Sequence, residues 1–154
     1  MTNTNHSLGK GQSDEHYTPA QLFDALRLEF DLDVASPKNG SHVPAKKLFH
    51  KEMDGLKQDW WGNVWMNPPY SNPTPWVDKF LDHHFGIALL PITRGKWWDR
   101  LWSSDCAILP LIYNFKFERP DDLSAKPIVF RTALYGFGNI NVEAMRMSGL
   151  GKMR

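Results

Sequence analysis

Residues 64–70 have the sequence Val-Trp-Met-Asn-Pro-Pro-Tyr, an apolar run followed directly by an amide side chain, two prolines and an aromatic ring. The apolar run predicts a buried strand at 64–66, with Asn67 at its carboxyl end. Proline fixes its own φ and disfavours the helical conformation of the residue before it, so Asn67 and Pro68 are held extended. Neither proline has an N–H group, so the segment presents carbonyls and side chains with few donors of its own.

The four residues 67–70 suit an amino-group acceptor. The Asn67 side-chain carbonyl and the Pro68 backbone carbonyl can each accept one N–H hydrogen bond. Because the lone pair of an amine on a planar base is delocalised, such bonds favour the more tetrahedral nitrogen of a transition state. Tyr70 offers a flat face for a base removed from its stack, a contact worth roughly 1–3 kcal/mol. A strand ending in this tetrad is a recognised arrangement for methyl transfer to an amino nitrogen; the simpler alternative is a proline-rich turn with Tyr70 as a packing residue.

Composition limits the class of protein. A chain of 154 residues with 42% hydrophobic and 13% aromatic residues predicts one globular domain. The net charge of +1 argues neither for nor against nucleic acid, so any basic patch must be local. The single cysteine, Cys106, excludes an internal disulfide and a cysteine metal site, and it fits a reducing cytosol. We expect no membrane role, because no apolar run approaches 18 residues and no signal peptide is evident, and no metal site.

The chain divides into three parts by pattern. Residues 1–15 are polar and predict a flexible arm, residues 16–135 predict the folded domain, and the Gly- and Met-rich residues 136–154 predict an irregular tail. A first helix is expected to start with Thr18 as N-cap, Pro19 as first helical residue and Gln21 completing a capping box. A second is expected to be capped by Thr74. That second helix is expected to end at Gly86, and a third is expected at 96–103. Strands are expected at 30–35, 87–92, 107–112, 115–118 and 128–134, and a short strand or helical turn at 46–50.

Strands that alternate with helices predict an open α/β sheet, whose ligands lie beyond the carboxyl ends of the strands. Asp33 and Asn67 both stand near such ends. An acidic group at Asp33 can accept hydrogen bonds from a cationic amino-acid group or from ribose hydroxyls, although an acidic residue at a strand end is common. The segment between 33 and 67 is too short for several βα units, since each crossover takes roughly a dozen residues or more. We therefore predict a trimmed sheet, without the glycine-rich fingerprint of many methyltransferases.

Several short motifs follow one another in a familiar order: Tyr-Thr-Pro at 17–19, Leu-Asp-Val-Ala at 32–35, Asp-Gly-Leu at 54–56, Trp60, and Trp-Met-Asn-Pro-Pro-Tyr-Ser at 65–71. With residues 76–79 and 89–91 they resemble the small phage-type DNA N6-adenine methyltransferases over roughly residues 15–130. The resemblance implies a Rossmann-like S-adenosylmethionine-dependent methyltransferase fold, with an open, mostly parallel sheet and helices on both faces. It also implies S-adenosyl-L-methionine as methyl donor, adenine in DNA as acceptor, and the cytoplasm of a bacterial host cell as location.

The same resemblance implies roles for individual residues. Thr18 and Pro19 would lie against the methionine part of the cofactor, Asp33 would be its acidic contact, and Asp54 would lie near its ribose or adenine. Asp54 is equally well explained as an ordinary turn residue. The target adenine would be held by Asn67, Pro68, Pro69 and Tyr70.

Candidate DNA contacts are Arg94 and Lys96, which follow a strand expected to end at the same sheet edge as Asn67. Arg100, Lys46, Lys47 and Lys51 are further candidates, and each of these cations is explained as well by a solvated surface. Two other functions remain open on the sequence. One is methyl transfer to an RNA base or a protein glutamine amide, and the other is a non-catalytic nucleic-acid-binding module that keeps the fold.

Overall fold

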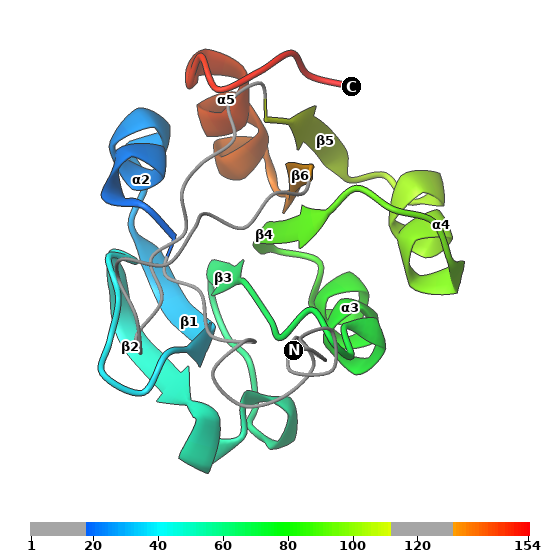
Figure 1. The fold of residues 1–154 in the computed structure, drawn as a ribbon. Coiled ribbons are helices and arrows are strands. Elements are labelled where there is room, and N and C mark those ends of the chain that lie inside the picture. Colours follow the sequence, from blue (N-terminus) through cyan, green and yellow to red (C-terminus); the bar gives the residue numbers. More distant parts are fainter. Residues whose placement is uncertain (1–17, 112–130) are drawn as a thin grey trace, which may run out of the picture.

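A computed structural model describes residues 18–111 and 131–154, which form an α/β structure around one mixed sheet (Figure 1). The six strands lie in the order β2-β1-β3-β4-β6-β5. β2, β1, β3 and β4 are parallel to one another, β6 is antiparallel to β4, and β5 is antiparallel to β6. The predicted mostly parallel sheet is therefore confirmed, because only β6 runs in the opposite direction.

The strands are short and buried on both faces in the middle of the sheet. Burial is complete along β3, and along β4 up to its last residue, as expected for central strands between two helical layers. β2, at the edge, exposes three of its six residues and buries one. The strands are β1 (Phe30–Ser36), β2 (Ala45–His50), β3 (Val64–Met66), β4 (Gly86–Pro91), β5 (Ala107–Pro110) and β6 (Thr132–Phe137).

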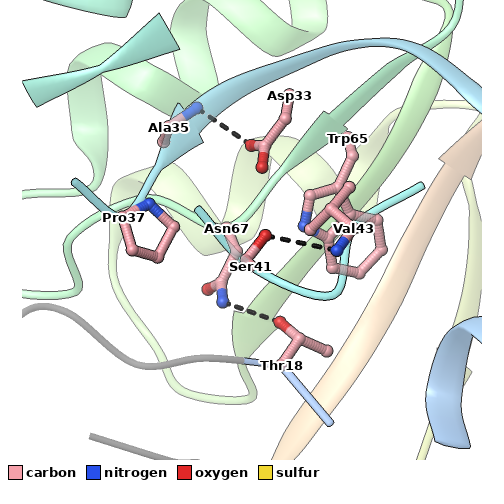
Figure 2. Close-up of a pocket in the computed structure, with 8 residues that line it drawn as sticks. All are labelled: Thr18, Asp33, Ala35, Pro37, Ser41, Val43, Trp65 and Asn67. Carbon is pink, nitrogen blue, oxygen red and sulfur yellow. Dashed lines mark hydrogen bonds between the residues drawn. The ribbon is translucent and has the colours of Figure 1, made fainter. Parts of the chain in front are cut away.

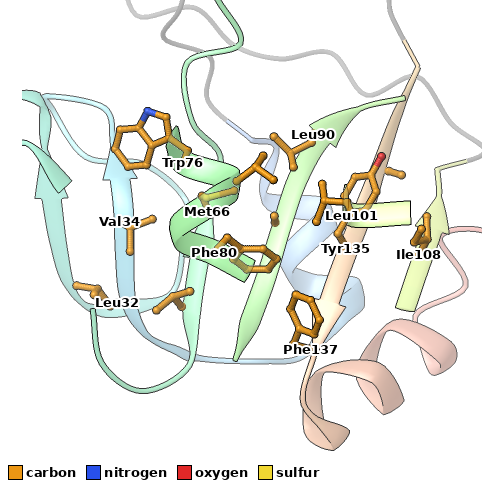
Figure 3. Packing of buried hydrophobic residues seen from close by; sticks show 14 of the residues in the cluster. Leu32, Val34, Met66, Trp76, Phe80, Leu90, Leu101, Ile108, Tyr135 and Phe137 are labelled. Atoms are coloured by element: carbon orange, nitrogen blue, oxygen red, sulfur yellow. The ribbon is translucent and has the colours of Figure 1, made fainter. Parts of the chain in front are cut away.

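Helices cover both faces of the sheet, as predicted. One face packs against α3 (Thr74–His83) and α4 (Lys96–Ser103), and its core includes Met66, Phe80 and Tyr135 (Figure 3). The other face packs against α2 (Ala20–Leu26) and α5 (Asn139–Met147). The separation follows from the strand period, because neighbouring residues of a strand point to opposite faces.

The connections at the start of the sheet are unusually short. β1 and β2 are parallel neighbours joined only by residues 37–44, and β2 is joined to β3 through two 3-10 turns, η2 (Lys51–Met53) and η3 (Gly55–Lys57). No α-helix lies between β1 and β3, which the structure describes without a gap. The prediction of a trimmed sheet is thus confirmed on this side.

Two predicted helix caps and the prediction of an irregular tail are wrong. Pro19, not Thr18, is the N-cap of α2, and Pro73, not Thr74, is the N-cap of α3; neither helix has a side-chain cap hydrogen bond. The tail predicted to be irregular contains the end of β6 and the whole of α5. That helix is fixed by tertiary contacts: Asn141 and Asn63 exchange two amide hydrogen bonds of 2.8 Å in the core. The arm at 1–15 and the strand at 115–118 lie outside the described residues.

Candidate active site

One hollow lies where the carboxyl ends of β1 and β3 meet the start of α2 (Figure 2). Asp33 pairs with Trp65 in the β1–β3 register, so their side chains share one face of the sheet. Two residues later Asn67 points to the same face, because side chains alternate along a strand. The hollow, about 10 Å³, is lined by Thr18, Asp33, Ala35, Pro37, Ser41, Val43, Trp65 and Asn67. Three of the residues predicted to be functional, Thr18, Asp33 and Asn67, are thus brought together.

Asp33 is a buried acid in this hollow. Its side chain is 2% exposed, and burial raises its pKa from the ordinary 3.8 to about 7. Hydrogen bonds from the Ala35 N–H, at 3.2 Å, and from the Ser36 hydroxyl oppose the rise but do not cancel it. In residues 18–111 and 131–154 no cationic side chain pairs with Asp33. A buried carboxyl with a strongly perturbed pKa and no cation beside it is a typical feature of a binding site.

Asn67 is half-buried, and its amide has a defined partner. Its Nδ2 donates to the Thr18 hydroxyl at 3.1 Å, a bond that joins the tetrad to the segment just before α2 (Figure 2). This bond leaves the Asn67 Oδ1 as the acceptor on the other side of the amide group. The predicted role of Asn67 as a hydrogen-bond acceptor for an amine is therefore sterically and chemically open to it.

Tyr70 is held by the neighbouring strand. Its hydroxyl donates to the Leu89 carbonyl of β4 at 3.1 Å, and burial raises the pKa of the phenol, so it stays a protonated donor. The residue is partly buried and packs against the core. Pro68 is buried and Pro69 is half-buried. The ring is thus fixed at its hydroxyl end.

Asp54 lies away from the hollow and acts as a turn residue. Its φ is 56°, in the left-handed region, and its Oδ1 accepts a hydrogen bond from the Leu56 N–H at 3.2 Å. The next residue, Gly55, is pressed against the Val34 carbonyl, so that a Cβ there would overlap the β1 backbone. The turn interpretation of Asp54 is confirmed, whereas a cofactor contact stays a prediction.

The segment after Asp54 is tied down by α3. Lys79 donates to the carbonyls of Leu56, at 2.9 Å, and Gln58, at 2.5 Å, and its ammonium lies 5.4 Å from the centre of the Trp60 ring. Trp60 in turn donates to the Gly55 carbonyl at 2.9 Å. Hydrogen bonds therefore join the motif residues Gly55, Trp60 and Lys79 into one structural cluster, which lies outside the hollow.

The candidate DNA-binding cations fall into two groups. Arg94 and Lys96 are exposed after β4, and neither forms an ion pair in the described part of the chain. Arg131 was not among the predicted contacts. Its side chain is exposed, and its carbonyl accepts from the Ile92 N–H at 2.9 Å, which brings its backbone next to the segment that carries Arg94. Arg100 instead pairs with Asp78 on α3, and Lys46 pairs with Asp31 at 3.3 Å. Arg100 and Lys46 are thus explained by the fold alone.

The remaining expectations concern metals and membranes. Within the described ranges no three metal-ligating side chains come together, and His83 is engaged with the Gly62 carbonyl at 2.8 Å. The same residues include no helix that is both apolar enough and long enough to cross a bilayer. Ser41 and Val43, which also line the hollow, were not predicted to be site residues. The one feature that could have indicated them is the shortness of the connection at 37–44, which keeps these residues close to the end of β1.

Comparison with known proteins identifies the family. A family model described as DNA N-6-adenine-methyltransferase (Dam) matches residues 5–102, which include Thr18, Asp33 and the tetrad. The DNA N-6-adenine-methyltransferase of Haemophilus phage HP1 (strain HP1c1) is 33% identical over 110 residues, covering 64% of this chain and 61% of that protein. The protein of the same name from Escherichia phage T1 is 35% identical over 77 residues, 46% of this chain and 31% of that protein.

The chain spans less than two thirds of the length of either relative. No solved structure matches it. The family model nevertheless covers more than half of the chain and the whole of the hollow described above. On this evidence the chain belongs to the DNA N-6-adenine-methyltransferase (Dam) family.

Proposed function

We propose that this protein transfers a methyl group from S-adenosyl-L-methionine to the N6 amino group of an adenine in DNA, in the cytoplasm of a bacterial host cell. The observation that carries the proposal is the meeting of Asp33, Thr18 and Asn67 in one hollow at the carboxyl ends of β1 and β3. The printed names of both phage relatives favour adenine in DNA over an RNA base or a protein amide. The sheet is then a trimmed version of the Rossmann-like methyltransferase fold.

The residues of the hollow fit the amino-acid end of the donor. The Asp33 carboxylate suits an ammonium group, which would replace the cationic partner that the described chain does not supply. The Thr18 hydroxyl accepts from Asn67, so its own proton can be donated to a carboxylate. At about 10 Å³ the hollow holds little more than one water molecule, so the amino-acid end of the donor enters only if the walls of the hollow move apart. When bound, S-adenosylmethionine supplies an electrophilic methyl group.

The tetrad prepares the acceptor. The Asn67 Oδ1 and the Pro68 carbonyl accept the two N–H groups of the adenine amine, which directs its lone pair toward the methyl group. These hydrogen bonds strengthen as the nitrogen becomes tetrahedral, so they stabilise the transition state more than the ground state. Tyr70, fixed through Leu89, stacks on the adenine after it leaves the duplex.

Cations at the same sheet edge are the proposed DNA contacts. Arg94 and Lys96 follow β4, Arg131 precedes β6, and all three side chains are exposed without an acidic partner in the described residues. Phosphate contacts of this kind position the strand and carry no sequence information by themselves. We expect them to hold the backbone on either side of the flipped adenine.

The deciding experiment measures transfer of labelled methyl from S-adenosylmethionine to unmethylated DNA, followed by digestion to nucleosides. The wild type is compared with Asn67→Ala and with Asn139→Ala, which replaces an exposed asparagine at the start of α5. We expect N6-methyladenine from the wild type and from Asn139→Ala, and a loss of roughly 100-fold or more for Asn67→Ala, as for removal of other transition-state hydrogen bonds.

Two results would contradict the proposal. Label found in RNA or protein but absent from DNA would move the acceptor to another class. Equal turnover by the wild type and Asn67→Ala would remove the tetrad from the mechanism. Calorimetry with S-adenosylmethionine should show that Asn67→Ala still binds the donor within about threefold of wild type, because Asn67 acts on the acceptor.

A further inference from the structure

Thr18 makes an unexpected hydrogen bond. A threonine just before a helix commonly caps it by accepting from a backbone N–H of the first turn. In this protein α2 has no side-chain cap, and the Thr18 hydroxyl accepts from the Asn67 Nδ2 at 3.1 Å instead. Thr18 is 2% exposed, so water does not readily replace this partner. The Thr18 hydroxyl therefore binds a residue of the tetrad and does not cap the helix that follows it.

The bond fixes which end of the Asn67 amide faces the acceptor site. An asparagine amide has a carbonyl oxygen and an NH2 group of nearly equal size, and rotation about its last torsion is soft. Only the carbonyl can accept from the adenine amine. A hydroxyl can donate as well as accept, but in the proposed site the Thr18 proton is donated to the carboxylate of the bound donor. Thr18 then acts toward Asn67 only as an acceptor, which favours the orientation in which Nδ2 points to Thr18 and Oδ1 points away from it.

We propose that Thr18 is a positioning residue, whose hydroxyl holds the Asn67 side chain with its carbonyl oxygen toward the target amine. This inference rests on the proposed function, since it concerns the same methyl transfer. It differs from the cofactor role that the family resemblance implied for Thr18, because it acts through Asn67 on the acceptor. Thr18 also lines the hollow beside Asp33, so one residue joins the donor end of the site to the tetrad.

The test uses two substitutions of Thr18 and one matched control. Thr18→Val keeps the shape and removes the acceptor, whereas Thr18→Ser keeps the acceptor. Thr132→Val makes the same change at another buried threonine, which lies in β6 outside the hollow. Methyl transfer is measured in single turnovers with donor and DNA both saturating, and donor affinity is measured separately by calorimetry.

We expect Thr18→Val to slow the saturated transfer step by roughly 3- to 10-fold, the effect of losing one neutral hydrogen bond. Thr18→Ser and Thr132→Val should stay within about twofold of wild type by the same measure. A Thr18→Val protein that binds the donor more weakly but transfers at the wild-type rate when saturated would overturn the inference. An equal loss in Thr18→Ser and Thr18→Val would overturn it as well.

A second measurement does not depend on activity. The side-chain NH2 signals of Asn67 are assigned in an NMR spectrum by their disappearance in Asn67→Ala. Their exchange with water should be faster in Thr18→Val by roughly threefold or more and unchanged in Thr18→Ser. If the wild type does not methylate adenine, the proposed function fails, and this spectrum still decides whether Thr18 orients Asn67. Exchange that is identical in all three proteins would show that it does not.

Discussion

Replacement of Asp33 by asparagine is expected to make the protein more stable at neutral pH and poorer at binding its donor. The carboxyl is 2% exposed, and burial raises its pKa to about 7. Asparagine has nearly the same shape and can still accept from the Ala35 N–H through its carbonyl oxygen. It carries no charge, so the penalty for burying an ionised group disappears in the variant.

The sign and size of the effect follow from the two pKa values. The folded state binds the Asp33 proton more tightly than the unfolded state, whose pKa is the ordinary 3.8, so stability falls as pH rises from that value through about 7. At 1.36 kcal/mol per pKa unit, the full loss is roughly 4 kcal/mol at alkaline pH. Between about pH 5 and pH 8 the loss of stability is roughly 2.5 kcal/mol. The Asp33→Asn variant lacks this loss, so its advantage in free energy of unfolding grows by that amount.

The assay is urea unfolding followed by tryptophan fluorescence, at steps between about pH 5 and pH 8. Asp24→Asn, at an exposed position of α2, is the matched control. We expect the stability difference from wild type to rise with pH for Asp33→Asn and to stay flat for Asp24→Asn. A flat difference for Asp33→Asn would refute the reasoning, because it would mean that the Asp33 carboxyl is well solvated in the folded protein.

Donor binding should change in the opposite direction. In the proposed site the ammonium of the donor pairs with the ionised carboxylate, so wild-type affinity for S-adenosylmethionine should rise with pH up to about 7, and binding should be accompanied by release of a proton. Asp33→Asn should bind roughly 10-fold more weakly or worse and lose this pH dependence, since a charged hydrogen bond contributes about 1.5–3 kcal/mol. Calorimetry in two buffers of different ionisation enthalpy measures both effects, and equal affinity in the two proteins would place the donor elsewhere.

Three further substitutions test other parts of the site. Tyr70→Phe loses the hydrogen bond to Leu89 and should reduce the free energy of unfolding by about 1 kcal/mol. Tyr70→Ala removes the stacking face and should lower kcat/KM roughly 5- to 100-fold. Equal kcat/KM in the wild type, Tyr70→Phe and Tyr70→Ala would exclude stacking. Gly55→Ala forces a methyl group into the β1 backbone and should destabilise by about 1–3 kcal/mol in urea unfolding, and wild-type stability would show that the turn can move. Arg94→Gln should reduce the salt slope of DNA binding by about 1, while Arg146→Gln, which breaks an ion pair on α5, should not; equal slopes would remove Arg94 from the interface.

Local patterns were enough to locate most elements. The apolar run at 64–66 and the prolines after it predict β3 and its end, and α4 begins and ends as predicted. Half-buried Trp97 and Trp98 pack against the core, and Trp98 donates to the Tyr135 hydroxyl at 2.9 Å. Such features depend on neighbours within a few residues, which is why a sequence pattern reports them.

Predictions failed where a distant partner decided the outcome. The helix α5 was missed because its buried face includes Asn141, a residue that favours loops unless its amide is satisfied, and the partner that satisfies it is Asn63. Thr18 was expected to cap α2 for the same local reason, yet its hydroxyl bonds to Asn67, which is 49 positions away in the sequence. In both cases a side-chain hydrogen bond across the fold replaced the local one.

Short ordered motifs in the amino-acid sequence were sufficient to indicate the family, the tetrad and the acidic residue ahead of it. The three-dimensional arrangement was needed to show that Asp33, Thr18 and Asn67 line one hollow, that Asp54 is a turn residue, and that Arg131 lies beside Arg94. Strand register explains the difference. The pairing of Asp33 with Trp65 sets which side chains share a face, and the burial that results raises the pKa of Asp33; neither can be read from the spacing of residues along the chain.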